Sequence, residues 1–207
     1  SFKHVVSITI PESVCKIGDE AFADFDELQS VTVGDSVETI GNKAFANCSK
    51  LESVKFGKSL WKIGAYAFIE CEKLKSIVLP NNVKVILTGA FNDCCCLSSV
   101  TLSTSMTEIP AEAFAGCMAL TTVALPQSVT SIGDNAFYDC SLLSTISLAN
   151  VNHIGQSAFY DCRSLSEITL SDNLSVINDY AFKGCTSIKG VTIPESVKSI
   201  GYQAFGR

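Results

Sequence analysis

The chain has 207 residues, a formal net charge of −6 and a sequence pI of about 4.9. An acidic chain without a basic cluster argues against nucleic acid or an anionic lipid surface as the partner. No run of 18 apolar residues occurs, so the sequence predicts no membrane span. The opening Ser-Phe-Lys-His has none of the features of a signal peptide, but a mature secreted protein would also lack them.

One short repeat runs through the whole chain. An Ala-Phe pair recurs nine times, at steps of 23 residues with a single step of 22, and its phenylalanines are Phe22, Phe45, Phe68, Phe91, Phe114, Phe137, Phe159, Phe182 and Phe205. A fixed period in this range is typical of supersecondary units that stack into a solenoid. The short step falls near Ala149 and Asn150, where we expect one shortened surface turn.

The elements of one repeat follow each other in a constant order. A short strand with one buried face comes first, as in residues 99–102, and it often ends at a proline such as Pro80 or Pro126. A Ser or Asn then follows, which we expect to hydrogen-bond the turning backbone. A second alternating stretch, as in residues 129–132, predicts another short strand, and a glycine such as Gly133 suits a tight corner after it.

The Ala-Phe-x-x-Cys stretch completes the repeat. Asp or Asn often precedes it, as at Asp19, Asn42, Asp134, Asn135 and Asp179, and this pattern predicts one capped helical or 3₁₀ turn.

Stacking is the only way for such units to bury their apolar columns, at roughly 4.8 Å per repeat. We therefore predict an α/β solenoid with a parallel β-sheet and short helical or 3₁₀ turns. It should form a single domain over residues 1–207, with about eight repeats. Because Phe205-Gly206-Arg207 offers no polar cap, we expect the chain to be a fragment of a longer array.

The unit Ile-Gly-x-x-Ala-Phe-x-x-Cys-x-x-Leu-x-x-Val-x-Leu-Pro-x-Ser-Val resembles the BspA-like leucine-rich repeat family over essentially the whole chain. It differs from the plant and animal repeat in that an apolar residue directly follows the Ser/Asn column. The resemblance implies a surface or secreted protein that adheres to host or microbial proteins. It implies no enzyme activity, and it transfers no binding residues to this chain.

Seven of the ten cysteines stand three residues after the repeated Phe, at Cys48, Cys71, Cys94, Cys117, Cys140, Cys162 and Cys185. Zinc needs ligands that converge from several directions, whereas these side chains run parallel, an arrangement that also suits disulfides poorly. We expect buried free thiols that act as small apolar fillers, against the alternatives of a metal or redox ladder. Cys15, Cys95 and Cys96 lie outside this ladder and are the candidates for exposure.

Nothing in the sequence predicts catalysis. His4 and His153 are separated by about six repeats, too far for a shared nucleophile-base site, and we expect both at the surface. The glycines follow the repeat period and form no phosphate-binding loop. We therefore predict that the protein is not an enzyme and uses no cofactor or metal.

Two surfaces are candidates for ligand binding. The outward strand positions are mostly Ser and Thr, including Thr101 and Thr122, which either form a binding platform or simply tolerate an exposed sheet. The second candidate is a pair of tyrosines in one column, Tyr138 and Tyr160, followed by Asp139 and Asp161. Stacked exposed aromatics are enriched in binding sites, although partly buried edge packing would explain them equally well.

Trp61 and Tyr66 add another possible anchor. The leading hypothesis is an adhesin-like module at the cell surface or secreted, whose partner is a protein, either host extracellular or microbial. The alternative is a cytoplasmic interaction scaffold, which unpaired cysteines favour. A remote third possibility, ice binding through the Thr-bearing strands, is weakened by Lys55, Val78 and Ala124 in the Thr column.

Overall fold

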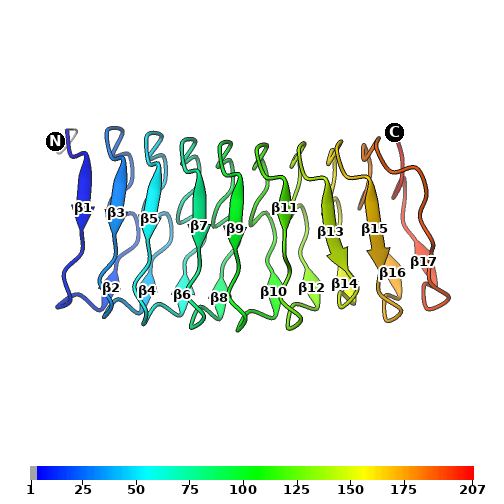
Figure 1. Cartoon of the computed structure of the whole chain (residues 1–207), viewed down its shortest axis with the longest axis horizontal. Coiled ribbons are helices and arrows are strands. Elements are labelled where there is room, and N and C mark those ends of the chain that lie inside the picture. Colours follow the sequence, from blue (N-terminus) through cyan, green and yellow to red (C-terminus); the bar gives the residue numbers. More distant parts are fainter. Residues whose placement is uncertain (1–3) are drawn as a thin grey trace.

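The computed structural model describes residues 4–207, so the Ser-Phe-Lys that opens the chain lies outside it. The described chain winds into a straight stack of coils, each about one sequence repeat long, and the two termini lie at opposite ends of the stack (Figure 1). A coil has three sides: one short strand, a second short strand, and the Ala-Phe turns, except that the last coil forms no first strand.

The first strand of each coil forms what we call the first strand face. Its strands are parallel and pair in register from coil to coil, for example Ile8 with Val31 and Ile146 with Ile168. The ladder is divided into a five-stranded and a three-stranded sheet between β9 and β11. The strands of this face are Ser7–Thr9 (β1), Ser30–Thr32 (β3), Ser53–Lys55 (β5), Ser76–Val78 (β7), Ser99–Thr101 (β9), Thr122–Val123 (β11), Thr145–Leu148 (β13) and Glu167–Leu170 (β15).

The second alternating stretch forms the second strand face, as the sequence predicts. It has a four-stranded and a five-stranded parallel sheet, in which the isoleucines pair with each other, as Ile40 does with Ile63. Its strands are Lys16–Ile17 (β2), Thr39–Ile40 (β4), Lys62–Ile63 (β6), Val85–Ile86 (β8), Glu108–Ile109 (β10), Ser131–Ile132 (β12), His153–Ile154 (β14), Val176–Ile177 (β16) and Ser199–Ile200 (β17).

The prediction of helical or 3₁₀ turns is wrong. In residues 4–207 the Ala-Phe stretch forms turns, and two positions of each turn but the last adopt positive φ, such as Lys43 at 53° and Asn47 at 59°. Left-handed residues interrupt a right-handed helix after a single turn. The intervening N–H groups point along the stack instead, where Phe45 N donates to Ala67 O at 2.8 Å. The fold is therefore mainly β, and the predicted α/β class is corrected accordingly.

The interior is a set of apolar columns, as predicted. The nine phenylalanine rings stack along the solenoid with centroids 5.2–5.7 Å apart and planes within 16° of parallel. Phe45 to Phe182 are buried, whereas Phe22 and Phe205 in the end coils are half-buried. Each ring therefore contacts the core of two neighbouring coils, except at the two ends.

Polar side chains connect neighbouring coils in place of capping their own turns. Asp19 Oδ1 accepts a hydrogen bond at 2.7 Å from the backbone N–H of Asn42, one coil further on, and Asp134 and Asp179 do the same. The predicted local caps are thus inter-coil bonds. The Ser/Asn column likewise reaches the preceding coil, where Ser128 Oγ donates to Thr104 O at 2.9 Å.

Candidate binding site

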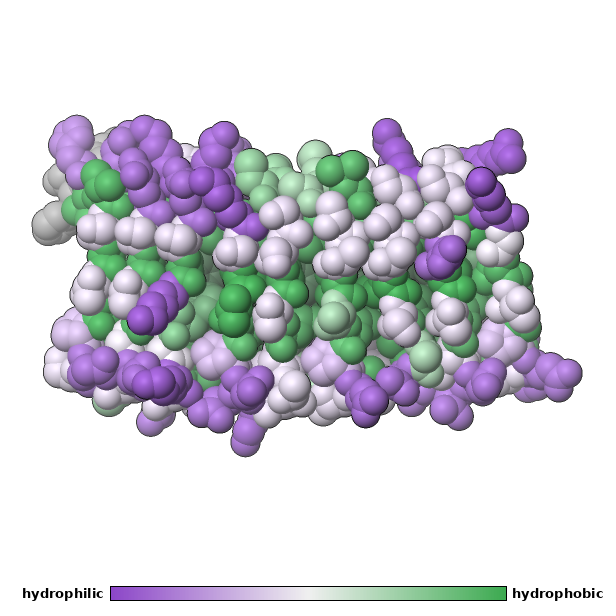
Figure 2. Space-filling view, viewed as in Figure 1, coloured by the Kyte–Doolittle hydropathy of each residue, from purple (hydrophilic) through white to green (hydrophobic). Residues whose placement is uncertain are grey.

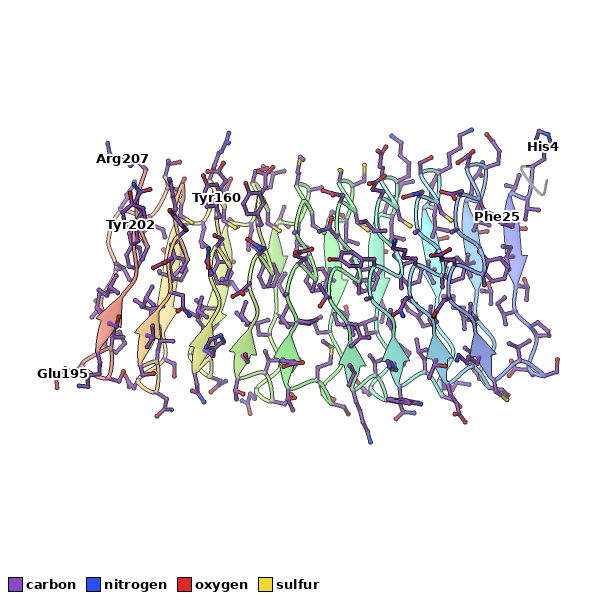
Figure 3. The ribbon with its side chains drawn as sticks, turned by 180° about the vertical axis from the view of Figure 1, so that it is seen from behind. His4, Phe25, Tyr160, Glu195, Tyr202 and Arg207 are labelled. Atoms are coloured by element: carbon purple, nitrogen blue, oxygen red, sulfur yellow. The ribbon has the colours of Figure 1, made fainter. Side chains whose placement is uncertain are left out.

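The tyrosine pair predicted from the sequence forms a stack on the turn side of the solenoid. Tyr138 and Tyr160 each follow a core phenylalanine, and their rings lie 4.9 Å apart at an interplanar angle of 10°. Tyr138 is 40% exposed, and Tyr160, visible in the view from behind in Figure 3, is half-buried. The next residue of this column is Lys183, whose Nζ lies 5.8 Å from the Tyr160 ring centroid.

The two neighbouring acids occupy the left-handed positions of the same turns. Asp139 and Asp161 have φ of 52° and 56°, and both are half-buried. Asp161 pairs with Arg163 at 3.0 Å. The pKa of Tyr138 is raised, first by desolvation and then by Tyr160, Asp161 and Asp139, so both carboxylates act on this ring. The four predicted residues therefore form one cluster, which we call the tyrosine site.

A charge pattern around this site was not recognised from the sequence. Residues 85–162 contain no Lys or Arg but six acids, Asp93, Glu108, Glu112, Asp134, Asp139 and Asp161. The coil of Tyr138 and the coils before it, back to residue 85, are therefore anionic. The cations of the site, Arg163 and Lys183, lie on its other side, next to Asp161 and Tyr160. Counting charges by coil would have revealed this segregation.

Thr101 and Thr122 lie elsewhere, on the first strand face. Both are exposed, on β9 and β11, and Thr122 lines an open hollow together with Thr145, Glu167 and Thr169. Figure 2 shows this face, where side chains of intermediate hydropathy, drawn pale, lie in rows over a green apolar background. The threonines and the tyrosine site occupy different sides of the coil, so the structure separates the six predicted residues into two surfaces.

Trp61 and Tyr66, the other possible aromatic anchor, do not form one surface. Trp61 is 41% exposed and lines a hollow on the second strand face. Tyr66 is half-buried, and its hydroxyl donates to Glu112 Oε2 at 2.9 Å, two coils away. This hydrogen bond is the main cause of the raised pKa of Tyr66. Tyr66 therefore holds coils together, and only Trp61 remains free to contact a ligand.

All ten cysteines are free thiols. The seven ladder cysteines are buried, as expected, and each Sγ donates to the carbonyl of the phenylalanine in the preceding coil, as Cys71 does to Phe45 O at 3.2 Å. This regular hydrogen bond was not foreseen. Of the three other cysteines, Cys15 and Cys96 are exposed, while Cys95 is half-buried.

We expect the ladder cysteines to resist alkylation in the native protein. Burial raises the pKa of Cys48 to about 11 and that of Cys185 to about 12, and the thiolate is the reactive form. Mass spectrometry after iodoacetamide treatment at pH about 8 should show Cys15 and Cys96 labelled first, and the ladder only after denaturation. Rapid native labelling of most ladder cysteines would contradict their place in the core.

The histidines lie apart at the surface, with His4 exposed in the first coil and His153 exposed on β14. Among the described residues, no three His, Cys, Asp or Glu side chains are grouped so that they could hold a metal ion. Residues 4–207 also contain no helix long and apolar enough to cross a membrane.

The fold defines a leucine-rich repeat solenoid, built from short parallel strands and a continuous apolar core. The family profile for the BspA type Leucine rich repeat region matches residues 1–120 and 88–207. The chain therefore belongs to the BspA-type leucine-rich repeat family. No curated protein sequence matches it significantly.

Solved structures share this architecture. A leucine-rich repeat protein from Bacteroides ovatus is 29% identical with a TM-score of 0.69, and the match covers 97% of this chain and 64% of that one. The leucine-rich repeat protein of T. pallidum is 25% identical, with a TM-score of 0.50 and coverage of 95% and 73%. The pneumococcal vaccine antigen PcpA, at 24% identity, TM-score 0.62 and coverage of 96% and 69%, shares the fold.

Proposed function

We propose that this protein is an adhesin-like binding module, at the cell surface or secreted, that recognises a protein ligand through the tyrosine site. The observation that carries the proposal is the parallel stack of the exposed Tyr138 ring on the half-buried Tyr160 ring. Rings of this kind supply a large contact area at low cost in side-chain entropy. The hydrogen bonds from Tyr138 N to Asn135 O and from Asp139 N to Tyr160 O hold the backbone in place before a ligand arrives.

The local charge indicates the chemistry of the partner. Asp139 and Asp161 flank the rings. Asp161 is already paired with Arg163, whereas Asp139 is in no ion pair with any of residues 4–207, and residues 85–162 contain no Lys or Arg. A partner segment with Lys or Arg would find complementary charge beside Tyr138. Its cation could lie over an aromatic ring, as Lys183 Nζ lies over the ring of Tyr160. Association should therefore weaken as the salt concentration rises.

The double change Tyr138→Ala/Tyr160→Ala should abolish most of this binding while the protein still folds. The measurement is biolayer interferometry against a panel of purified extracellular-matrix and microbial surface proteins. We expect at least a tenfold loss of affinity, in line with two aromatic contacts of about 1 kcal/mol or more each, and unchanged circular dichroism.

The matched comparison is Thr101→Lys/Thr122→Lys on the first strand face. If the threonine variant loses binding and the tyrosine variant does not, the strand face is the binding surface and the tyrosine site is not. If neither variant changes the affinity for any bound protein, both candidate surfaces are wrong.

The second candidate function is an intracellular interaction scaffold. The observation that favours it is the set of ten free thiols, because oxidising compartments tend to pair cysteines. Membership of the BspA-type family supports the surface location instead. Antibody labelling of intact and permeabilised cells distinguishes the two, since only a surface protein is labelled without permeabilisation.

A further inference from the structure

A second concave surface lies far from the tyrosine site, on the second strand face near β2, β4 and β6, at the end of Figure 1 that holds the N-terminus. We call Ile40, Gly41 and Gly64 its floor, because the Ile40 side chain is buried in the core and the two glycines have no side chain. The side chains around this floor are those of Lys16, Asp19, Thr39, Asn42, Trp61 and Lys62.

Trp61 forms an aromatic wall of this hollow. It is the only tryptophan of the chain, and 41% of it is exposed. Its backbone is held on both sides, because Trp61 N donates to Glu38 O and Trp61 O accepts from Lys84 N, each at 3.0 Å. An exposed indole on a fixed backbone offers a flat apolar face with a polar N–H edge, which suits a ligand that is apolar on one side and polar at its rim.

The polar groups of the hollow include both donors and acceptors. Asp19 uses Oδ1 for the N–H of Asn42, and Asn42 uses Oδ1 for the N–H of Ala65. Both side chains therefore stay fixed while the second carboxylate oxygen and the amide NH₂ remain available to a ligand. With the Thr39 hydroxyl, this set matches a compound that carries several hydroxyl groups.

The charges around the floor favour an anion. Lys16 and Lys62 line the hollow against a single acid, Asp19, and neither lysine is in an ion pair with any of residues 4–207. A cationic ligand would meet two like charges beside the indole. An added peptide strand is also disfavoured, because β4 and β6 are paired on both sides and offer no free edge.

From this combination we infer that the Trp61 hollow binds an acidic oligosaccharide. One pyranose ring stacks its C–H face on the indole, its hydroxyls bond to Asp19, Thr39 and Asn42, and a carboxylate on the sugar is held by Lys16 and Lys62. The inference goes beyond the proposed protein-binding function and does not depend on the tyrosine site.

Because Trp61 is the only tryptophan, its fluorescence reports on this site alone. Hyaluronan tetrasaccharide, trigalacturonate and 3′-sialyllactose are titrated into the full chain, with neutral cellotetraose as the comparison. We expect a saturable change in emission with at least one acidic saccharide, weaker binding of cellotetraose, and loss of affinity with added salt. The absence of a saturable change with all three acidic probes overturns the inference, as does equal binding of cellotetraose.

Variants then locate the binding by calorimetry. Trp61→Leu should lower the affinity at least tenfold, Trp61→Phe should lower it less, and Lys16→Gln/Lys62→Gln should lower it about fivefold and remove the salt dependence. The control is Lys84→Gln, since Lys84 follows Trp61 by one coil but does not line the hollow. Saccharide binding that survives Trp61→Leu in a folded protein contradicts the site.

The Tyr138→Ala/Tyr160→Ala variant separates the two proposals. It should bind the acidic saccharide as the parent does, whatever its effect on protein ligands. A loss of saccharide binding in this variant would place the sugar at the tyrosine site and overturn the assignment to Trp61.

Discussion

Replacing Phe114 by Ala should destabilise the protein by about 3–5 kcal/mol, because the ring is fully buried in the middle of the stack. Its centroid lies 5.7 Å from that of Phe91 and 5.6 Å from that of Phe137, so the cavity would open between three coils. The carbonyl of Phe114 also accepts the thiol of Cys140 at 3.1 Å, and a backbone shift into the cavity would disturb that bond. Urea unfolding followed by circular dichroism measures the loss.

Phe205→Ala is the matched control in the same column. Phe205 is half-buried and stacks on Phe182 alone, at 5.3 Å. In a stack where each coil contacts only its neighbours, a terminal ring contributes through one interface, so we expect roughly half the loss or less. Equal losses at the two positions would contradict the description of stability as a sum over neighbouring coils.

The repeat made the core predictable from the sequence. Nine Ala-Phe pairs at a nearly constant step fix which positions face inward, and Phe114, Leu120 and Ile109 are all fully buried in the columns where the period places them. Both strands of each coil were also predictable, because apolar and polar residues alternate there.

The turn side was not predictable in the same way. A short stretch with an Asp or Asn before it is compatible with a capped helical turn, and single residues do not reveal that Lys43 or Asn47 adopts positive φ. The hydrogen-bond partners of the polar groups in these turns lie in the neighbouring coil, and a pattern of adjacent residues does not predict them. The pairing of Asp19 with Asn42 N would have required the assumption that each side chain serves the next coil.

Of the candidate sites, the sequence predicted the stack of Tyr138 and Tyr160, because equal columns in successive repeats must be adjacent. It could not place Lys16, Asp19 and Trp61 around one hollow, since they belong to different columns. Equivalent positions of successive repeats must contact each other along the solenoid. Contacts between different positions of the repeat depend on how the chain bends at the corners of each coil.

The glycine column shows a second consequence of coil stacking, and it leads to the other large effect that we expect. We predict that Gly155→Ala destabilises the protein by about 1–3 kcal/mol. A Cβ at Gly155 would lie 2.5 Å from Asp134 N, from Asp134 Oδ1 and from Gly133 C in the preceding coil. The sequence suggested glycine for a tight corner, but the close approach of the neighbouring coil is the stronger reason.

The hydrogen bond of Asp134 requires the space that the missing side chain of Gly155 leaves free. The Asp134 carboxylate reaches over the glycine to accept the N–H of Gln156 at 2.7 Å, through the space that a methyl group would take. Each coil with Asp or Asn at this position is followed by glycine in the next coil, in the pairs Asp19 and Gly41, Asn42 and Gly64, Asp134 and Gly155, and Asp179 and Gly201. Where the position holds Ala65, Thr88 or Gln156, the next coil has Leu87, Pro110 or Asn178, and the one exception is Ala111, which is followed by Gly133.

Gly18 provides the control for this prediction, because it occupies the same column in the first coil and a Cβ there meets nothing within 4 Å. Gly18→Ala should be neutral or stabilise the protein by up to about 1 kcal/mol, since alanine restricts the unfolded chain more than glycine does. The two variants are compared by urea unfolding under identical conditions. Equal changes in the free energy of unfolding at Gly155 and Gly18 would show that local backbone conformation, and not the approach of the preceding coil, selects glycine in this column.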